Sequence, residues 1–232
     1  MAHRIGVIGG DGIGPQIVAA AMKAVRATGV DIDEVSFDLG ADRYLRDGYV
    51  LDDADLARIR ACDAILKGPL GPAIGDTRVP GGTVERGIIL RLRFELDQYI
   101  NLRPFTGTSV ATGESLDFVV IRENTEGSYA GEGGFLRKGT PHEIATQGSV
   151  NTRMGVERCV RYAFDLAMGR PRRHLTLVHK TNVLTFAGDL WQRTFNEVAA
   201  EYPDVTTAYN HVDASCIYLV EAPTRYNSVF PE

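Results

Sequence analysis

The sequence has few cysteines, no excess of positive charge and no long apolar run. Its three cysteines, Cys62, Cys159 and Cys216, are far apart and lack the spacing of a metal site, so we expect reduced thiols, mostly buried. The formal net charge of −5 offers no basic surface for nucleic acid. No segment is long and apolar enough to span a membrane, and a strand-like segment starts at Ile5, which leaves no room for a signal peptide. We therefore expect a cytoplasmic protein that binds neither nucleic acid nor a membrane.

Apolar segments alternate with amphipathic ones over the first hundred residues. The pattern predicts strands at 5–8, 35–39 and 64–68, separated by helices at 17–25 and 52–59. Such alternation is typical of an α/β fold with a parallel sheet, whose loops gather at the edge where ligands bind. The long loop at 69–82, rich in proline and glycine, would lie at that edge. Function and disorder are both open for a loop of this length.

A glycine loop, Gly9-Gly10-Asp11-Gly12-Ile13-Gly14-Pro15, joins the first strand to the first helix. The dinucleotide-binding fingerprint is G-x-G-x-x-G, whereas Gly10, Gly12 and Gly14 are evenly spaced and Pro15 follows at once. A plain dinucleotide-binding domain is therefore the less favoured interpretation. We expect a tight turn whose free amides can approach a ligand.

The second half of the chain has its own α/β pattern. It predicts strands at 118–121, 175–178 and 209–213, helices at 154–168 and 190–200, and a polar hairpin or arm at 131–152. The character of the sequence changes after Pro104. We therefore expect two domains, 1–103 and 104–232.

Two arginines mark the junction between these halves. Arg93 lies on an amphipathic segment that reads as a helix, and Arg103 lies on the extended exit before Pro104. Guanidinium groups suit carboxylates because both can form two parallel hydrogen bonds. Solvation, or pairing with Glu95 or Asp97, is the alternative.

Polar side chains also follow the predicted strands of the second half. Arg122 and Tyr129 follow one strand, Lys180 the next and Asp213 a third. Cations, a phenol, an amine and a carboxylate fit a dicarboxylate substrate on which acid and base chemistry is done. Each has a structural alternative: Lys180 as a solvated strand end, Tyr129 as a packed arm residue, and Asp213 as the cap of a helix starting at Ala214.

Four motifs occur in the order seen in the β-decarboxylating dehydrogenases of the isocitrate/isopropylmalate dehydrogenase family. They are Gly-Asp-Gly-Ile-Gly-Pro at 10–15, Asn-Leu-Arg-Pro at 101–104, Arg-Glu-Asn-Thr-Glu-Gly at 122–127 and His-Lys-Thr-Asn-Val-Leu at 179–184. The chain resembles this family from about Arg4 to Tyr226. The resemblance implies an isopropylmalate-dehydrogenase-like α/β fold with a parallel-sheet first domain, here incomplete, and a second α/β domain whose arm, at about 131–152, makes a homodimer.

The activity that the resemblance implies is a metal-dependent oxidative decarboxylation of 3-isopropylmalate, of the leucine-biosynthesis type. The cofactors would be NAD and Mg²⁺ or Mn²⁺. Arg93, Arg103 and Arg122 would bind the carboxylates of this small 2-hydroxy dicarboxylic acid. The metal would polarise the hydroxyl and then stabilise enolate charge.

The same resemblance assigns roles to three further residues. Lys180 would act in removing the hydroxyl proton, from the partner subunit's side of the cleft. Tyr129 would protonate the enolate carbon left by decarboxylation. Asp213 would contact the substrate and be one of three aspartates that hold the metal, also across the dimer.

Ile89 bears on the choice of substrate within the family. It precedes Arg93 by four residues, so a helix would place both on one face. An apolar side chain there favours a branched alkyl group over the third carboxylate of isocitrate. The run Ile88-Ile89-Leu90 could instead belong to the core, and Arg86 keeps tartrate-, malate- and homoisocitrate-like substrates open.

After Tyr226 the sequence departs from the family's pattern. The family continues into an Asn-Leu-Phe-Gly-Asp motif, a helix with a further aspartate and a His-Gly-Ser-Ala-Pro loop for the cofactor's adenosine, none of which follows here. We expect a C-terminal truncation, with metal and cofactor binding weakened or lost. The alternatives are an impaired dehydrogenase subunit and a non-catalytic remnant that serves as a binding or interaction module. NAD and NADP both stay open, because the discriminating loop is absent.

Overall fold

The computed structural model describes residues 2–226 and 228–231. The chain forms two compact units, Met1–Asp97 and Gln98–Glu232. The sequence placed the division at residue 103. In the structure residues 100–108 pair along their whole length with 115–123, so this strand belongs to the second unit.

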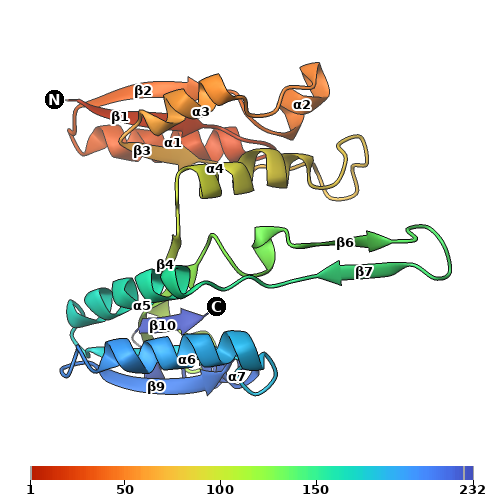
Figure 1. Ribbon diagram of the computed structural model, residues 1–232. Helices are drawn as coiled ribbons and strands as arrows, with labels where there is room; N and C mark the ends of the chain where they lie inside the picture. Colours follow the sequence, from red (N-terminus) through yellow and green to blue (C-terminus); the bar gives the residue numbers. More distant parts are fainter. Residues whose placement is uncertain (1, 227, 232) are drawn as a thin grey trace. The chain divides into compact units, whose positions relative to one another are not determined.

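The first unit is built on a three-stranded parallel sheet in the order β2-β1-β3 (Figure 1). Its strands are β1 (His3–Ile8), β2 (Ile32–Phe37) and β3 (Ala64–Lys67). Its helices are α1 (Gly14–Ala27), α2 (Ala41–Asp47), α3 (Asp53–Arg60), the π-helical segment η1 (Glu85–Leu90) and α4 (Arg91–Glu95). The parallel sheet predicted from the alternating pattern is confirmed. Helix α2, with seven residues, was not predicted.

The core of the first unit lies between the sheet and the helices that follow it. Val84, Ile88 and Leu92 recur every four residues along η1 and α4, and all three are buried with Ile8 of β1. Helix α3 begins where the acidic pattern predicted, because the Asp52 side chain accepts a hydrogen bond from the amide of Asp55 at 2.7 Å.

The helix that carries Arg93 is shorter than its apolar pattern suggests. It begins as a π-helical turn at Glu85 and ends at Glu95, after which Asp97 adopts a left-handed conformation (φ 46°). The apolar residues that continue the pattern, from 99 to 102, belong instead to the entry into an extended strand. In the sequence, the apolar residues of the helix and of the following strand together resemble a single helical period.

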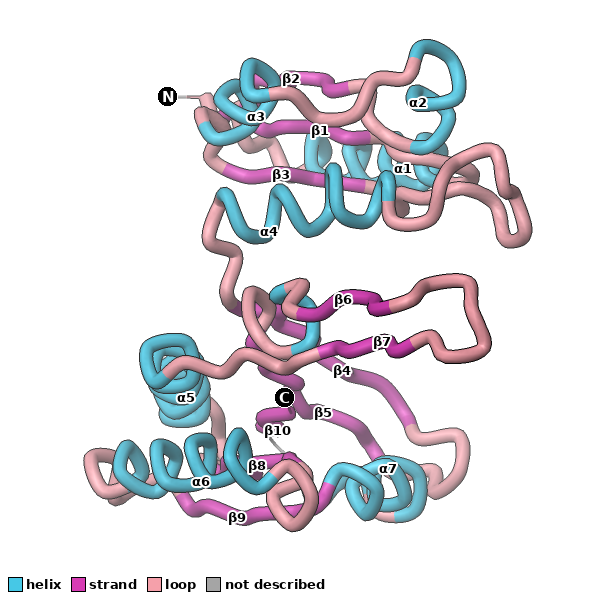
Figure 2. The backbone as a smooth tube through the Cα atoms, turned by 45° about the vertical axis from the view of Figure 1, so that its right-hand side comes forward, coloured by secondary structure: helices cyan, strands magenta, loops and turns pink. Residues whose placement is uncertain are grey.

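The second unit is built on a five-stranded mixed sheet in the order β4-β5-β10-β8-β9 (Figure 2). Its strands are β4 (Ile100–Thr108), β5 (Ser115–Glu123), β8 (His174–His179), β9 (Thr206–His211) and β10 (Ser228–Pro231). Its helices are α5 (Arg153–Met168), α6 (Thr185–Ala199) and α7 (Val212–Glu221), with 3-10 turns η2 (Ser128–Ala130) and η3 (Pro223–Arg225). Only β4 is antiparallel to its neighbour in this sheet.

Strand β5 shows why this sheet is covered on both faces. Val119 and Ile121 point into the larger core, which α5 and α6 complete. Phe118 lies in a second cluster with Tyr226, against which Val120 packs. A strand with apolar residues on both faces reads as a continuous apolar run, which is the pattern that predicted it.

The hairpin predicted at 131–152 is present as a two-stranded antiparallel ribbon that projects from the sheet of the second unit (Figures 1 and 2). Its strands are β6 (Gly133–Leu136) and β7 (Ile144–Gln147). Phe135 and Leu136 are exposed by 60% and 56%, so the arm has no apolar cover of its own.

Several predicted boundaries and one burial assignment were wrong. Helix α6 begins at Thr185 rather than at 190, and α7 begins at Val212. The three cysteines are free thiols, but only Cys159 is buried. Cys62, in the connection between α3 and β3, is half-buried against the core of the first unit, and Cys216 on α7 is exposed. Burial raises the pKa of the Cys159 thiol.

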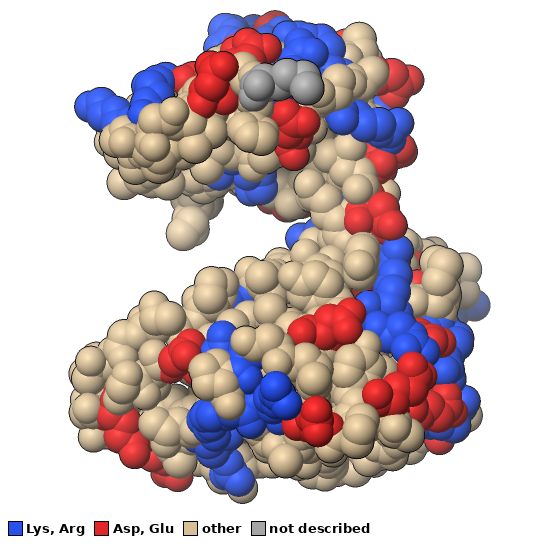
Figure 3. All heavy atoms as spheres, turned by 90° about the vertical axis from the view of Figure 1, so that its left-hand side faces the viewer, with Lys and Arg blue, Asp and Glu red and all other residues tan. Residues whose placement is uncertain are grey.

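The surface carries charged side chains of both signs, interspersed over the face drawn in Figure 3. Many form exposed ion pairs, such as Arg161 with Glu201 at 2.8 Å, which contribute little to stability. Within the described residues no helix has the length and apolar character needed to cross a membrane.

Candidate functional site

The first unit presents Ile89 and Arg93 next to its core. Ile88 is fully buried, whereas Ile89 and Arg93 are half-buried, so Ile88 and not Ile89 occupies the core position. Arg86 is exposed. The alternative that the whole run 88–90 belongs to the core is therefore wrong for Ile89. Its side chain is partly accessible and could contact a ligand bound by Arg93.

A second cation beside Arg93 was missed in the sequence. Lys67 is the last residue of β3, and burial lowers the pKa of its ammonium, with the charge of Arg93 adding to the effect. Its place at the carboxyl end of a parallel strand is where ligand contacts are expected, and this signal could have identified it.

The glycine loop is occupied by its own contacts. The amide of Asp11 donates to the carbonyl of Pro69 at 2.8 Å, and the amide of Gly14 donates to the carbonyl of Asp11 at 2.9 Å. A Cβ on Gly10 would lie 2.1 Å from the Pro69 carbonyl oxygen, so the glycine permits two backbone segments to touch. The amides of Asp11 and Gly14 are thus already bonded to backbone carbonyls, which corrects the expectation of free amides for these two residues.

The buried side chain of Asp11 connects three segments of the first unit. Its carboxylate accepts hydrogen bonds from the amides of Ala41 at 2.8 Å, Asp42 at 3.0 Å and Gly71 at 2.8 Å. This fixes the start of α2 and the start of the loop at 69–82 against the glycine loop. The residue serves the architecture of this edge.

In the second unit, β4 and β5 place two arginines on one face of the sheet. Asn101 is directly opposite Arg122 in the antiparallel register, and Arg103 is two residues from Asn101, so all three side chains share a face. Arg103 Nε donates to Asn101 Oδ1 at 2.9 Å. The guanidinium carbon of Arg122 lies 4.9 Å from the centre of the Tyr129 ring. Arg103, Arg122 and Tyr129 are thus brought together.

Lys180 and Asp213 form a second group at the same edge. Lys180 follows β8, Asp213 lies in the first turn of α7, and Lys180 Nζ donates to Asp213 Oδ1 at 2.7 Å. This bond holds the pKa of the Asp213 carboxyl below its usual range. The helix cap at Asp213 is wrong, because His211 occupies the cap position. Strand β10 lies between this group and β5.

The described residues do not make a metal site by themselves. No three His, Cys, Asp or Glu side chains among residues 2–226 and 228–231 are grouped so as to hold an ion. Asp213 is a single, largely exposed carboxylate that is already bonded to an ammonium. A divalent metal needs more oxygen ligands than this, so the residues present do not fit one.

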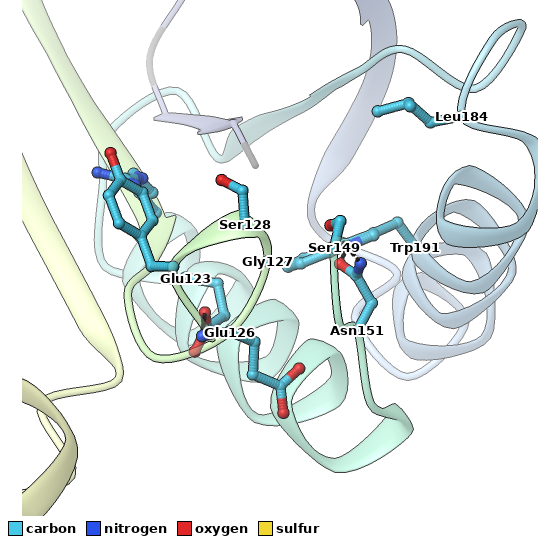
Figure 4. Close-up of a pocket in the computed structure, with 10 residues that line it drawn as sticks. Glu123, Glu126, Gly127, Ser128, Ser149, Asn151, Leu184 and Trp191 are labelled. Atoms are coloured by element: carbon cyan, nitrogen blue, oxygen red, sulfur yellow. Dashed lines mark hydrogen bonds between the residues drawn. The ribbon is translucent and has the colours of Figure 1, made fainter. Parts of the chain in front are cut away.

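A pocket in the second unit adjoins Arg122 and Tyr129. Its lining includes Glu126, Ser128, Asn151 and Trp191 (Figure 4). Trp191 Nε1 donates to Asn151 Oδ1 at 2.9 Å, which fixes one wall.

Solved structures share this architecture. Isocitrate dehydrogenase from Methylococcus capsulatus aligns with 99% of this chain and 66% of its own, with a TM-score of 0.86 and 37% identity. A β-decarboxylating dehydrogenase from Thermococcus kodakarensis aligns with 99% of this chain and 64% of its own, with a TM-score of 0.74 and 34% identity. A family model described as isocitrate/isopropylmalate dehydrogenase matches residues 4–230. The chain belongs to this family, and the α/β fold expected from its motifs is confirmed.

Within this family, the chain is similar in sequence to curated 3-isopropylmalate dehydrogenases. The 3-isopropylmalate dehydrogenases of Corynebacterium aurimucosum and Corynebacterium diphtheriae are each 56% identical to this chain over 231 residues, which is 97% of this chain and 67% of the relative. That of Nocardia farcinica is 53% identical, with 97% and 68% covered. The chain spans about two thirds of the length of these relatives.

Proposed function

We propose that this protein acts in the oxidative decarboxylation of 3-isopropylmalate with NAD and Mg²⁺ or Mn²⁺, as in leucine biosynthesis. The observation that carries the proposal is the 56% identity to 3-isopropylmalate dehydrogenases across nearly the whole chain. The shared face of Arg103 and Arg122 supports it, because two guanidiniums side by side suit a dicarboxylate.

Substrate recognition would rest on arginine side chains. Arg103 and Arg122 would bind carboxylate oxygens of the 2-hydroxy acid, and Arg93 of the first unit would bind a carboxylate as well. Ile89, half-buried and outside the core, would contact the branched alkyl group. An apolar contact of this kind separates substrates by only about 1–3 kcal/mol, so malate- and tartrate-like acids remain competitors in the test.

The acid and base steps would fall to Tyr129 and Lys180. Lys180 would accept the hydroxyl proton as a neutral amine, so its ammonium must first lose a proton and its bond to Asp213. When the neighbouring carboxylate leaves as CO₂, the Tyr129 hydroxyl would deliver a proton to the enolate carbon.

No step is assigned through the metal or the nicotinamide. The described residues supply one carboxylate, Asp213, towards an ion, and two amides of the glycine loop, those of Asp11 and Gly14, are already bonded. In our proposal Asp213 contacts substrate and metal only together with further ligands.

We also propose a homodimer in the cytoplasm. Phe135 and Leu136 on the arm, and Ile217 and Val220 on one side of α7, are exposed by more than half of their surface. Apolar residues exposed in this number are typical of a protein interface. Free thiols at all three cysteines agree with a reducing compartment.

A non-catalytic binding module is the second candidate. It is favoured by the bond between Lys180 and Asp213, which engages both groups, and by the lack of a metal-binding group within the described residues. Such a module would keep substrate affinity through the arginines without turnover.

Titration calorimetry with 3-isopropylmalate, with and without Mg²⁺, tests both candidates when combined with an assay for reduced nicotinamide. Metal-dependent binding and turnover support the dehydrogenase, and binding without turnover supports the module. Arg122→Gln should weaken binding by roughly 10- to 100-fold, since a charge-assisted hydrogen bond contributes about 1.5–3 kcal/mol. Arg193→Gln, an exposed arginine on α6, is the matched control. Equal affinity of both variants would refute the proposed site.

A further inference from the structure

The segment from Glu123 to Tyr129 leaves β5 along a path that a buried carboxylate fixes. Glu123 is 7% exposed and accepts hydrogen bonds from the amide of Thr125 at 2.8 Å, its hydroxyl at 2.5 Å and the amide of Glu126 at 2.6 Å. Arg158 Nη2 also donates to the Thr125 hydroxyl, at 2.9 Å. The first half of the segment is therefore rigid and ends at Glu126.

Glu126 then reaches across to the beginning of α5. Its carboxylate accepts from the amide of Thr152 at 2.8 Å and from the Thr152 hydroxyl at 2.5 Å. The same hydroxyl accepts from the amide of Gly155 at 3.0 Å and caps the helix. Glu126 thus binds the residue that caps the helix. Its negative charge lies near the N-terminus of this 16-residue helix, the positive end of the helix dipole.

Gly155 shows how closely Glu126 lies against the helix. A Cβ at this position would be 2.4 Å from the Glu126 carboxyl carbon. Any side chain there would displace the carboxylate, so the glycine leaves the space that this contact occupies.

The residues between Glu126 and Tyr129 are held by the returning strand of the arm. The amide of Gly127 donates to the carbonyl of Val150 at 2.7 Å, and the amide of Val150 donates back at 3.1 Å. Gln147 Nε2 donates to the carbonyl of Ser128 at 3.0 Å. Figure 4 shows Ser128 and Ser149 on the wall of one pocket. Tyr129 is therefore placed by the base of the arm on one side and by Glu126 on the other.

We propose that Glu126 is a positioning residue that links the dimer arm to Tyr129. Through Thr152, the last residue before α5, it clamps the end of the arm to the segment that carries the phenol. Docking of the arm in a dimer would then set where the proton donor lies. This inference rests on the proposed function, in which Tyr129 protonates the enolate carbon.

Glu126→Gln is the informative variant, because it keeps the shape of the side chain but replaces one carboxylate oxygen with an amide nitrogen, which donates and cannot accept. Glu114→Gln is the matched control. Its carboxylate also accepts from a threonine hydroxyl, Thr112 at 3.2 Å, but it lies in the turn between β4 and β5, at the opposite end of β5 from Glu123.

Hydrogen–deuterium exchange of the purified chain gives a readout that does not depend on turnover. We expect Glu126→Gln to speed exchange at least tenfold in peptides covering 127–131 and 147–152, and Glu114→Gln to leave both unchanged. Unchanged exchange in Glu126→Gln would overturn the proposal. This result would stand even if the parent chain showed no turnover, an outcome that would count against the proposed function alone.

Kinetics then separate positioning from a general structural role. Glu126→Gln should lower kcat on the order of a hundredfold with KM nearly unchanged, because a small displacement of a catalytic group is costly while the arginines stay in place. In a Tyr129→Phe background the same change should have no further effect. Thr152→Ser should retain parent activity, and Thr152→Val should not. Additive losses in the double variant would contradict the proposal.

Discussion

The two units cover their sheets to different degrees. In the first, a three-stranded sheet has β2 and β3 as its edges, and helix α1 exposes Ile17 by 47%. In the second, β5, β10 and β8 are interior strands with apolar clusters on both faces. A core closed on two sides resists opening more strongly than one whose helix faces water. We therefore expect the second unit to resist unfolding more strongly than the first.

Buried carboxylates show the same contrast in use. Asp11 in the first unit and Glu123 in the second both accept several hydrogen bonds from backbone or hydroxyl donors. Asp11 joins the start of α2 to the loop at 69–82, whereas Glu123 orders the segment that leads to Tyr129. Both units thus use a buried carboxylate to fix backbone segments, but only in the second unit does that segment lead to the proposed proton donor.

The largest effect expected is on the core of the second unit. Phe164 is fully buried, 5.1 Å from the rings of both Phe195 and Tyr202. Phe164→Ala should lower the free energy of unfolding of this unit by about 3–5 kcal/mol. Trp191, the only tryptophan, lies in the second unit, so its fluorescence in a urea titration follows that unit alone while circular dichroism follows both. A shift of the whole dichroism curve together with the fluorescence would show that the units unfold as one.

Removing the charge of Glu123 should have a smaller effect. Glu123→Gln places an amide against the donors of Thr125 and Glu126 and should cost about 1.5–3 kcal/mol of unfolding free energy, measured with the same fluorescence probe. Glu114→Gln, an exposed counterpart, should change it by less than about 0.5 kcal/mol. An equal loss of unfolding free energy in Glu123→Gln and Glu114→Gln would mean that the hydrogen bonds of the buried Glu123 add no more stability than those of the exposed Glu114.

A pH titration should also separate the units. Burial lowers the pKa of His174, with nearby Arg172 adding to the effect, and both ring nitrogens face threonine hydroxyls at 3.1 Å. The unfolded chain binds the proton more readily. The contribution to stability is therefore present above the ordinary pKa of about 6.5 and is lost as the pH falls through and below it. The urea midpoint from Trp191 fluorescence should fall less between pH 7.5 and 5.5 in His174→Gln than in the parent, and an identical fall would refute the assignment.

The smallest effect belongs to the exposed side of α1. Ile17→Ser should change the unfolding free energy of the first unit by less than about 0.5 kcal/mol, because the side chain is already half in water. Circular dichroism, corrected for the transition reported by Trp191, measures this. A loss above 1 kcal/mol would show that this face is covered in solution and would weaken the contrast between the units.

Local sequence patterns predicted most of the elements correctly. The strands around 5–8, 64–68, 118–121 and 175–178 and the helix at 154–168 are confirmed within a few residues. Each of these segments has a single clear period, and the helix also has a side-chain cap at Thr152. The segment at 90–104 failed because a helix and a strand follow each other without a glycine or proline between them.

For the proposed site, the order of motifs along the chain identified candidate residues. It did not predict which of them lie close together in space. The sequence identified Arg103, Arg122 and Tyr129 as candidates, and the antiparallel register of β4 and β5 is what brings them together. It missed Lys67, although the carboxyl end of a parallel strand is a place where ligand contacts are expected. Glu126 was part of a recognised motif without a role, since its partner Thr152 lies 26 residues away.

By itself the sequence determined the family, the alternation of strands and helices and the residue types available for chemistry, because these depend on local periodicity and on motifs. Tertiary structure alone decided that Lys180 pairs with Asp213, that the glycine loop bonds to Pro69, and that Glu126 joins the arm to the segment of Tyr129. These facts depend on strand order and register, which bring together residues far apart in the chain and leave no trace in local composition.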